Sequence, residues 1–219
     1  LELPVVDISA FMRGCEADAR AKQDAADTLL EACTTVGAFH VVGHGISPEL
    51  QRAGFQRAAQ FFKLPAKVKR GVGTPPSASA GFTRGYIGMG EESGSDLLEV
   101  KEAFSYGYDW DPDTPPTNPL QGPNQWPADD VMGGEDWRRD MNELFARFVG
   151  ASRGVTACLS MALGLDEEEL WQHCTQGDTI SLMRLFRYFP YEVADGVQPD
   201  SGRIGSSPHT DWGWLTLIM

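Results

Sequence analysis

Residues 207–217 read SPHTDWGWLTL, a strand-like stretch near the end of the 219-residue chain. In a strand, side chains two positions apart project from the same face, so we expect His209 and Asp211 to point together. An imidazole and a carboxylate on one side are what a divalent metal such as iron(II) needs. A second histidine would complete a facial triad with open positions for a co-substrate and dioxygen.

The His-x-Asp spacing alone leaves two interpretations open. The pattern occurs often by chance, and such a pair is commonly a hydrogen-bonded couple at the surface or in the core rather than a metal site. The setting of the pair in the rest of the chain is needed to choose between them.

The composition is that of an ordinary soluble globular protein, with 42% hydrophobic and 22% charged residues, and the length fits one domain or a small pair. The formal net charge of −13 repels phosphate backbones and anionic lipids, so we expect neither nucleic acid nor a membrane as a partner. The first residues contain no basic segment followed by an apolar core. We expect a cytoplasmic protein, and no feature of the sequence specifies its oligomeric state.

Four cysteines are scattered through the chain and never form a Cys-x-x-Cys pair, so neither a zinc site nor a redox motif is indicated. They are Cys15, Cys33, Cys158 and Cys174. We expect them to be small buried apolar residues with free thiols, which suits the cytosol.

The residue pattern predicts a mostly helical first part and a β part that begins near residue 178. Apolar residues that recur every three or four positions indicate helices, and alternation indicates strands. We expect helices within 16–36, 47–65, 137–163 and 166–173, and strands within 3–8, 38–42, 102–108, 180–189 and 208–219. Residues 71–96 and 109–127, which are rich in Gly, Ser or Pro, should form loops.

Six separate segments, in order, resemble the isopenicillin N synthase-like family of iron(II)/2-oxoglutarate-dependent dioxygenases. They are LPVVDISAF (3–11), VGAFHVVGHGIS (36–47), FFKLPAKVKR (61–70), GYIGMGEESGSDLLEVKEAFSYGYD (85–109), SLMRLFRYFP (181–190) and SPHTDWGWLTLI (207–218). The third matches that family's Phe-Phe-x-Leu-Pro-x-x-x-Lys stretch, and the last carries its first two metal ligands. One match would be weak, whereas six in the right order are not expected by chance.

The resemblance implies an α+β fold in which a helical N-terminal region packs on a double-stranded β-helix, or jelly roll. It implies a non-haem dioxygenase N-terminal region over residues 1–125, connecting helices over 126–177 and the first jelly-roll strands over 178–219. The family's distal histidine and its Arg-x-Ser pair, which grips 2-oxoglutarate, would fall beyond Met219. We therefore expect an incomplete barrel with open edges, and a fragment that is inactive by itself.

By the same resemblance, His209 and Asp211 bind iron(II), and 2-oxoglutarate chelates the metal and is decarboxylated as dioxygen is activated. The implied reaction is the oxidation of a small molecule by hydroxylation, desaturation or ring closure. The absence of the distal half leaves a second possibility open, namely a degenerate non-catalytic member that acts as a binding protein.

The co-substrate segment departs from the family. Plant members tend to have Asn-Tyr-Tyr-Pro where this chain has RYFP at 187–190, so the tyrosine that commonly contacts 2-oxoglutarate aligns with Phe189. Either Tyr188 replaces it or the contact with 2-oxoglutarate is lost. Arg184 and Arg187 could each pair with a carboxylate of the substrate or co-substrate, or could form a structural salt bridge or lie on a solvated outer face. Strand alternation puts the two on opposite faces. This departure leaves open an iron-dependent oxidase or cyclase that does not use 2-oxoglutarate.

Other polar residues have structural explanations. His40 and His44 lie in a predicted strand and turn, where we expect structural hydrogen bonding. His173 ends an acidic helix and should lie at the surface, where a cation favours the helix dipole. For Lys101 and Glu102 we expect a structural ion pair.

Overall fold

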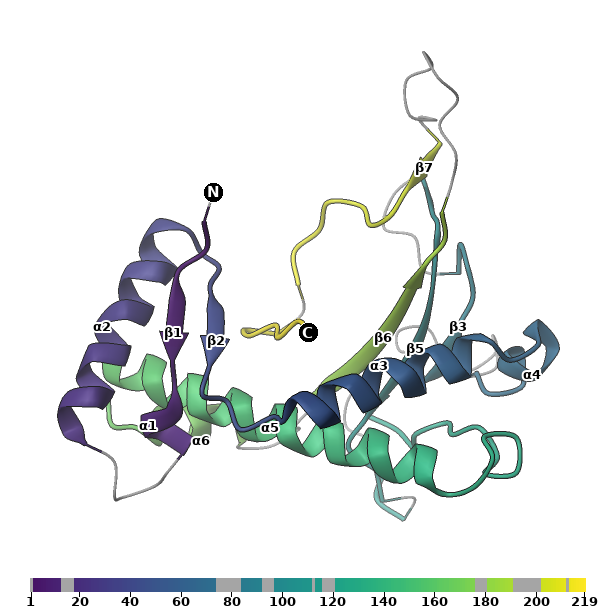
Figure 1. Cartoon of the computed structure of the whole chain (residues 1–219), viewed down its shortest axis with the longest axis horizontal. Coiled ribbons are helices and arrows are strands. Elements are labelled where there is room, and N and C mark those ends of the chain that lie inside the picture. The colour runs from purple at the N-terminus through teal and green to yellow at the C-terminus, as the bar shows by residue number, and fades with distance from the viewer. Residues whose placement is uncertain are drawn as a thin grey trace. The chain divides into compact units, whose positions relative to one another are not determined.

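The computed structural model describes residues 2–12, 18–73, 84–91, 97–111, 113–115, 121–175, 181–190, 202–211 and 213–219. Two compact units divide the chain. The first contains Leu1–Ala53, Asn142–Thr179 and Leu217–Met219, and the second contains Gly54–Met141 and Ile180–Thr216. Figure 1 gives the order and labels of the helices and strands within them.

The first unit is built on two parallel strands, β1 (Val5–Asp7) and β2 (His40–Val42). Parallel neighbours need a crossover connection, and α1 (Ser9–Met12) and α2 (Ala19–Thr35) lie in that connection. In Figure 1, α2 runs beside the strand pair. The strand–helix–strand order follows from the alternation of short β-branched runs with an amphipathic segment.

Helix α2 has one buried face and a defined start. The side chain of Asp18 accepts a hydrogen bond from the backbone N–H of Arg20 at 2.9 Å, which caps the N-terminus. The chain leaves the helix through Gly37, whose φ of 79° suits glycine. The buried residues recur at helical spacing and are Ala25, Ala26, Leu29 and Ala32.

Part of the long helix α5 (Asp136–Ala162) and the short helix α6 (Glu169–Thr175) complete the first unit. A close approach occurs at Gly154, because a Cβ atom there would lie 2.7 Å from Met12 Sδ and 3.2 Å from Ile8 Cδ1. The absence of a side chain at this position lets α5 pack directly against the start of the chain.

The second unit contains two small sheets. In the three-stranded antiparallel sheet, β5 (Lys101–Gly107) lies between β3 (Gly85–Ile87) and β6 (Leu182–Tyr188). In the other sheet, β4 (Leu98–Glu99) pairs in parallel with β7 (Arg203–Ile204). The central position of β5 explains why six of its seven residues are buried.

Aromatic side chains form the core of the second unit. The ring centroids of neighbouring members lie 4.6 to 6.0 Å apart, in tilted and edge-to-face arrangements. The members are Phe61, Phe104, Tyr106, Trp126 and Trp137. Alternation along β5 places Phe104 and Tyr106 on the same face.

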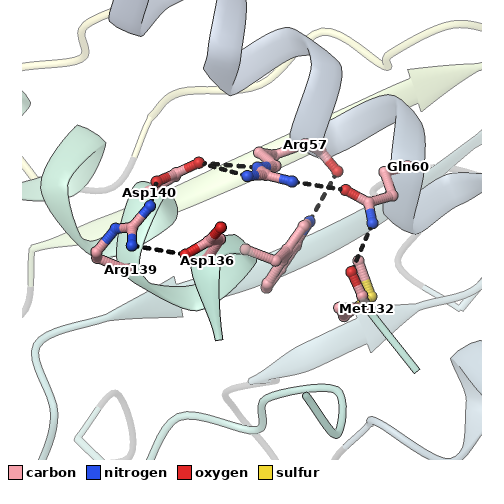
Figure 2. Close-up of polar contacts among 7 residues, drawn as sticks. Arg57, Gln60, Met132, Asp136, Arg139 and Asp140 are labelled. Carbon is pink, nitrogen blue, oxygen red and sulfur yellow. Dashed lines mark hydrogen bonds and ion pairs between the residues drawn. The ribbon is translucent and has the colours of Figure 1, made fainter. Parts of the chain in front are cut away.

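Polar contacts join α3 (Pro48–Phe62) to the first turn of α5 and the segment before it, as Figure 2 shows. Arg57 binds Asp140 with Nε–Oδ2 and Nη2–Oδ2 distances of 2.9 and 2.8 Å. The amide of Gln60 donates to the Met132 carbonyl at 2.7 Å. Trp137 Nε1 donates to the Arg57 carbonyl at 2.9 Å, so the aromatic core is also hydrogen-bonded to α3.

Most of the predicted helices and strands are confirmed, with ends that differ by a few residues. The predicted strand at 208–219 is wrong, because none of its described residues pairs with a neighbouring strand and Gly213 has a φ of 83°. Strands β3 and β4 fall in segments predicted as loop or left unassigned. The described strands do not close a barrel.

No helix in the described part of the chain is both long and apolar enough to cross a membrane. Another helix, α4 (Ala66–Arg70), follows Pro65. The cysteine prediction is correct for Cys158, which is buried, and wrong for Cys33 and Cys174, which are exposed. The three are free thiols, and Cys15 lies outside the described residues.

Candidate metal centre

His209 and Asp211 face each other in the segment that follows β7. The distance from His209 Nε2 to Asp211 Oδ1 is 3.1 Å, and the two side chains are 57% and 52% exposed. The structure thus brings together the two residues that the sequence singled out. It does so although the segment is not hydrogen-bonded as a strand.

The other ring nitrogen of His209 is occupied by a backbone contact. Nδ1 lies 2.7 Å from the carbonyl oxygen of Ser207. A carbonyl oxygen can only accept a hydrogen bond, so this contact assigns the proton to Nδ1 and leaves a lone pair on Nε2 in the neutral ring. A lone pair on Nε2 would repel the carboxylate oxygen that it faces, so the short distance requires either a proton on Nε2 or a metal ion bound by both atoms.

The geometry of this pair fits a divalent metal ion. Metal bonds of about 2.0–2.2 Å to an imidazole nitrogen and a carboxylate oxygen at right angles put the two donor atoms about 3 Å apart. Imidazole with carboxylate is also the donor set that non-haem iron(II) takes. Among the described residues no group of three histidine, cysteine, aspartate or glutamate side chains lies close enough to hold a metal. The described residues therefore contain at most two side chains of such a ligand set at this place.

A buried carboxylate on β4 holds the segment that carries the pair. Glu99 Oε1 accepts a hydrogen bond from the backbone N–H of Ser207 at 2.7 Å, and Oε2 lies 2.7 Å from Lys101 Nζ. Burial by itself would raise the pKa of Glu99, but the bonds from Lys101 and Ser207 outweigh burial and hold this pKa below its usual value. The carboxylate is thus ionised, and each of its two oxygens has a partner.

Arg184 and Tyr188 occupy the same face of β6 at different distances from this segment. Tyr188 is opposite Lys101 in the register, and its ring lies beside Gly205. Arg184 is opposite Ser105, four residues further along the strand. Tyr188 is 52% exposed and Arg184 is half-buried. Arg187 lies on the opposite face of the strand from Arg184, as alternation predicted.

Arg187 belongs to a buried ion cluster around Glu102. Arg187 Nη1 lies 3.1 Å from Glu102 Oε1, while Lys69 Nζ lies 2.6 Å from Oε2. The Tyr86 hydroxyl donates to Oε2 at 2.7 Å. Burial and this bond to Glu102 raise the pKa of Tyr86 above its ordinary value. The salt-bridge interpretation of Arg187 is therefore the correct one.

The predicted pairing of Lys101 with Glu102 needs correction. Each residue forms an ion pair, but Lys101 pairs with Glu99 and Glu102 pairs with Lys69. Adjacent residues of a strand point to opposite faces, so the two could not meet. The cluster had a signal in the sequence, since Glu102 lies on the same face as Phe104, where a charged residue needs a buried partner.

The remaining histidines have structural or surface positions. His44 Nδ1 accepts a hydrogen bond from the backbone N–H of Ile46 at 3.1 Å, as expected for a turn residue. His40 lies in β2, and His173 is exposed on α6. None of the three lies in the segment that holds His209.

Comparison with known proteins gives a family model and several relatives. Residues 3–129 match the model of the family described as "non-haem dioxygenase in morphine synthesis N-terminal". A 2-oxoglutarate-dependent dioxygenase of Monascus ruber is 32% identical and covers 99% of this chain and 64% of its own length. A homoarginine-6-hydroxylase of Arabidopsis thaliana is 31% identical, with the same two shares of 99% and 64%. The chain therefore spans less than two thirds of the length of these relatives.

A clavatol oxidase of Penicillium crustosum is 30% identical, covering 99% of this chain and 66% of its own. Among solved structures, a full-length Neurospora crassa protein in complex with alpha-KG is similar, with a TM-score of 0.74 and 26% identity. The similarity covers 96% of this chain and 61% of that one.

Proposed function

The chain belongs to the non-haem dioxygenase family, and from this premise we propose that the full-length protein is an iron(II)- and 2-oxoglutarate-dependent dioxygenase that oxidises a small molecule. In this proposal His209 and Asp211 are two of the iron ligands, and 2-oxoglutarate and dioxygen are co-substrates. The observation that carries it is the 3.1 Å approach of His209 Nε2 to Asp211 Oδ1, with Nδ1 held by Ser207.

Ser207, His209 and Asp211 each have a defined role in this proposal. The Ser207 carbonyl holds the Nδ1 proton of His209, so that Nε2 is free to bind the metal. The Asp211 carboxylate contributes the negative charge that offsets part of the charge of a divalent ion. Bound iron(II) would activate dioxygen as 2-oxoglutarate is converted to succinate and carbon dioxide.

The same proposal assigns Tyr188 and Arg184 to 2-oxoglutarate. A guanidinium forms strong charge-assisted hydrogen bonds to carboxylates, and a phenol donates one hydrogen bond. Their support is the shared face of β6, whose Tyr188 end lies beside the segment that leads to His209.

The jelly-roll assignment belongs to the proposal as well. Residues 1–125 would form the N-terminal region, 126–177 the connecting helices and 178–219 jelly-roll strands of a barrel that these residues do not close. The similarity to the Neurospora crassa structure, at a TM-score of 0.74, supports this assignment. A cytoplasmic location remains a prediction.

A small-molecule substrate is supported by the names of two relatives. One is named a clavatol oxidase and another a homoarginine-6-hydroxylase. Both names describe the oxidation of a small organic molecule. The class of reaction proposed here is accordingly hydroxylation, desaturation or ring closure of such a molecule.

The test is turnover of 2-oxoglutarate by the full-length protein. The protein is purified without oxygen, loaded with iron(II) and exposed to oxygen with 2-oxoglutarate, and succinate is measured. We expect succinate from the wild type and background levels from His209→Ala and Asp211→Ala, because each variant removes a donor atom. Matched controls are His173→Ala and Asp24→Ala, which remove an exposed histidine and a 71%-exposed aspartate and should leave succinate formation unchanged.

Activity that survives either ligand substitution would overturn the assignment of the site. Consumption of oxygen without any need for 2-oxoglutarate would instead support the oxidase or cyclase reaction. A wild-type protein that contains no iron after anaerobic purification, and takes up none, would support a binding protein that has lost catalysis.

A further inference from the structure

Glu99 makes a long-range contact that reaches almost to the candidate metal centre. The residue is 5% exposed and lies on β4, a strand of only two residues. Its bond to the Ser207 backbone N–H, 2.7 Å long, joins positions 108 residues apart in the sequence. Ser207 is itself 3% exposed, so water does not compete for this hydrogen bond.

This contact comes at the point where β-sheet pairing has ended. Strand β7 stops at Ile204, and the last ladder bond of that sheet runs from the Val100 N–H to the Ile204 carbonyl at 2.9 Å. The chain then continues through Ser206, whose hydroxyl lies 3.5 Å from Lys101 Nζ. The Glu99 bond is the short, buried tether of this segment.

Ser207 connects the tether to the ligand. Its N–H is bound by Glu99 and its carbonyl oxygen is 2.7 Å from His209 Nδ1. Fixing the N–H of Ser207 restricts the rotation of the residue, and therefore the direction of the carbonyl that orients the imidazole. Groups that orient a histidine ligand in this way typically change metal affinity about 10–100-fold when they are lost.

We propose that Glu99 is a positioning residue for the candidate metal centre, acting through the backbone of Ser207 on the ring of His209. The inference rests on the proposed function of His209 and Asp211. This role depends on the length of the side chain. Only a side chain as long as glutamate places an acceptor oxygen within hydrogen-bonding distance of the Ser207 N–H. Lys101 neutralises the second oxygen and keeps the carboxylate in place.

The chain offers a matched control three residues away. Glu102 has a 2%-exposed side chain and is paired with Lys69 and Arg187, so its substitution perturbs a buried ion pair on the neighbouring strand. Its partners are on α4, β3 and β6 rather than in the segment of Ser207. A general loss of stability would therefore affect Glu99 and Glu102 variants alike.

The experiment measures the affinity of the full-length protein for cobalt(II), used as an oxygen-stable probe, by titration calorimetry and visible absorption. Aspartate at position 99 keeps the charge but is about 1.5 Å shorter, so it cannot reach Ser207. We expect Glu99→Asp to weaken cobalt(II) binding about 10–100-fold. Glu99→Gln, which keeps an acceptor oxygen at full reach, should recover most of the affinity, and Glu102→Asp should bind like the wild type.

The outcomes distinguish a failure of the positioning role from a failure of the metal centre itself. Equal affinity of the wild type and Glu99→Asp overturns the positioning role, as does a loss in Glu102→Asp of the same size. A wild-type protein that does not bind cobalt(II), or binds it unchanged after His209→Ala, overturns the proposed metal centre itself. If Glu99→Asp does not fold, Glu99→Met, which keeps the length of the side chain but removes the acceptor oxygen, is compared with Glu99→Gln, and equal affinities of the two variants for cobalt(II) then overturn the role.

Discussion

At Glu102, two cations and a phenol converge on one buried carboxylate. Lys69 and Tyr86 bind one oxygen at 2.6 and 2.7 Å, and Arg187 binds the other at 3.1 Å. Lys69 also donates to the Phe62 carbonyl at 3.2 Å, so the cluster links α3, α4 and three strands of the sheet. A network of this kind is costly to break, because Lys69 would be left buried with an unsatisfied charge.

The cost of removing this carboxylate defines a prediction for stability. Glu102→Ala leaves Lys69, which has a 7%-exposed side chain, without its counter-ion, and should lower the free energy of unfolding by about 3–5 kcal/mol. Arg187→Ala should cost less, because Arg187 is 47% exposed and Lys69 still neutralises Glu102. Urea unfolding of the two variants measures both values. An equal loss of unfolding free energy in the two variants would show that the depth of burial of a residue does not set its contribution to stability.

Helices and strands were predictable wherever the signal was local. The start of α2 at Asp18 and the end of α3 before Pro65 depend on neighbouring residues, and both follow from capping and from the properties of proline. Strands β4 and β7 have two residues each and exist only because they pair with each other across more than a hundred positions. A single sequence contains no local signal for such a pairing.

In the candidate site, too, the local feature could be predicted and the long-range contact could not. The facing of His209 and Asp211 agrees with the prediction, although the strand on which the prediction rested is not formed. The contact of Glu99 with Ser207 was not predictable, because Glu99 resembles any charged residue beside a strand until the β4–β7 pairing is known.

The junction of β1 and β2 depends on a glycine, and this can be tested. Gly43 has a φ of 69°, and a Cβ atom there would lie 2.3 Å from Asp7 Oδ1 and 2.8 Å from the backbone nitrogen of Ser9. Gly43→Ala should therefore be destabilising through both the strained φ and the clash.

Gly37 provides the matched control, because its φ is 79° but a Cβ atom there would meet nothing within 4 Å. Gly37→Ala should lower the free energy of unfolding by about 1–2 kcal/mol, because of the left-handed conformation alone. Gly43→Ala should lower it by clearly more. Thermal unfolding of both variants gives the difference, and equal values would mean that the junction relaxes without cost.

At the scale of the whole molecule, a buried thiol links stability to pH. Burial, followed by the nearby Cys33, raises the pKa of Cys158 to about 12. An unfolded thiol ionises near pH 8.5. The unfolded state therefore loses its proton first, so the stability that Cys158 contributes is complete below about pH 8.5 and is lost as the pH rises towards 12.

Replacing this thiol should make the free energy of unfolding fall less steeply as the pH rises above 8. We expect the difference in free energy of unfolding between wild type and Cys158→Ala to narrow steadily as the pH rises from 8 to 10. Cys33→Ala is the control, since Cys33 is exposed and should give a much smaller change of slope. Parallel pH profiles for the wild type and Cys158→Ala would contradict the assignment.

The tether between Glu99 and Ser207 has a consequence for the order of folding. It closes a loop of 108 residues, and β4 and β7 that flank it are very short. Long loops lose the most chain entropy on closure, so contacts across them form after local helices and nearby strands have assembled. Segments held by few such contacts also open first under native conditions. The segment with His209 and Asp211 should thus be the last part to assemble and the first to open, while the aromatic core is still intact.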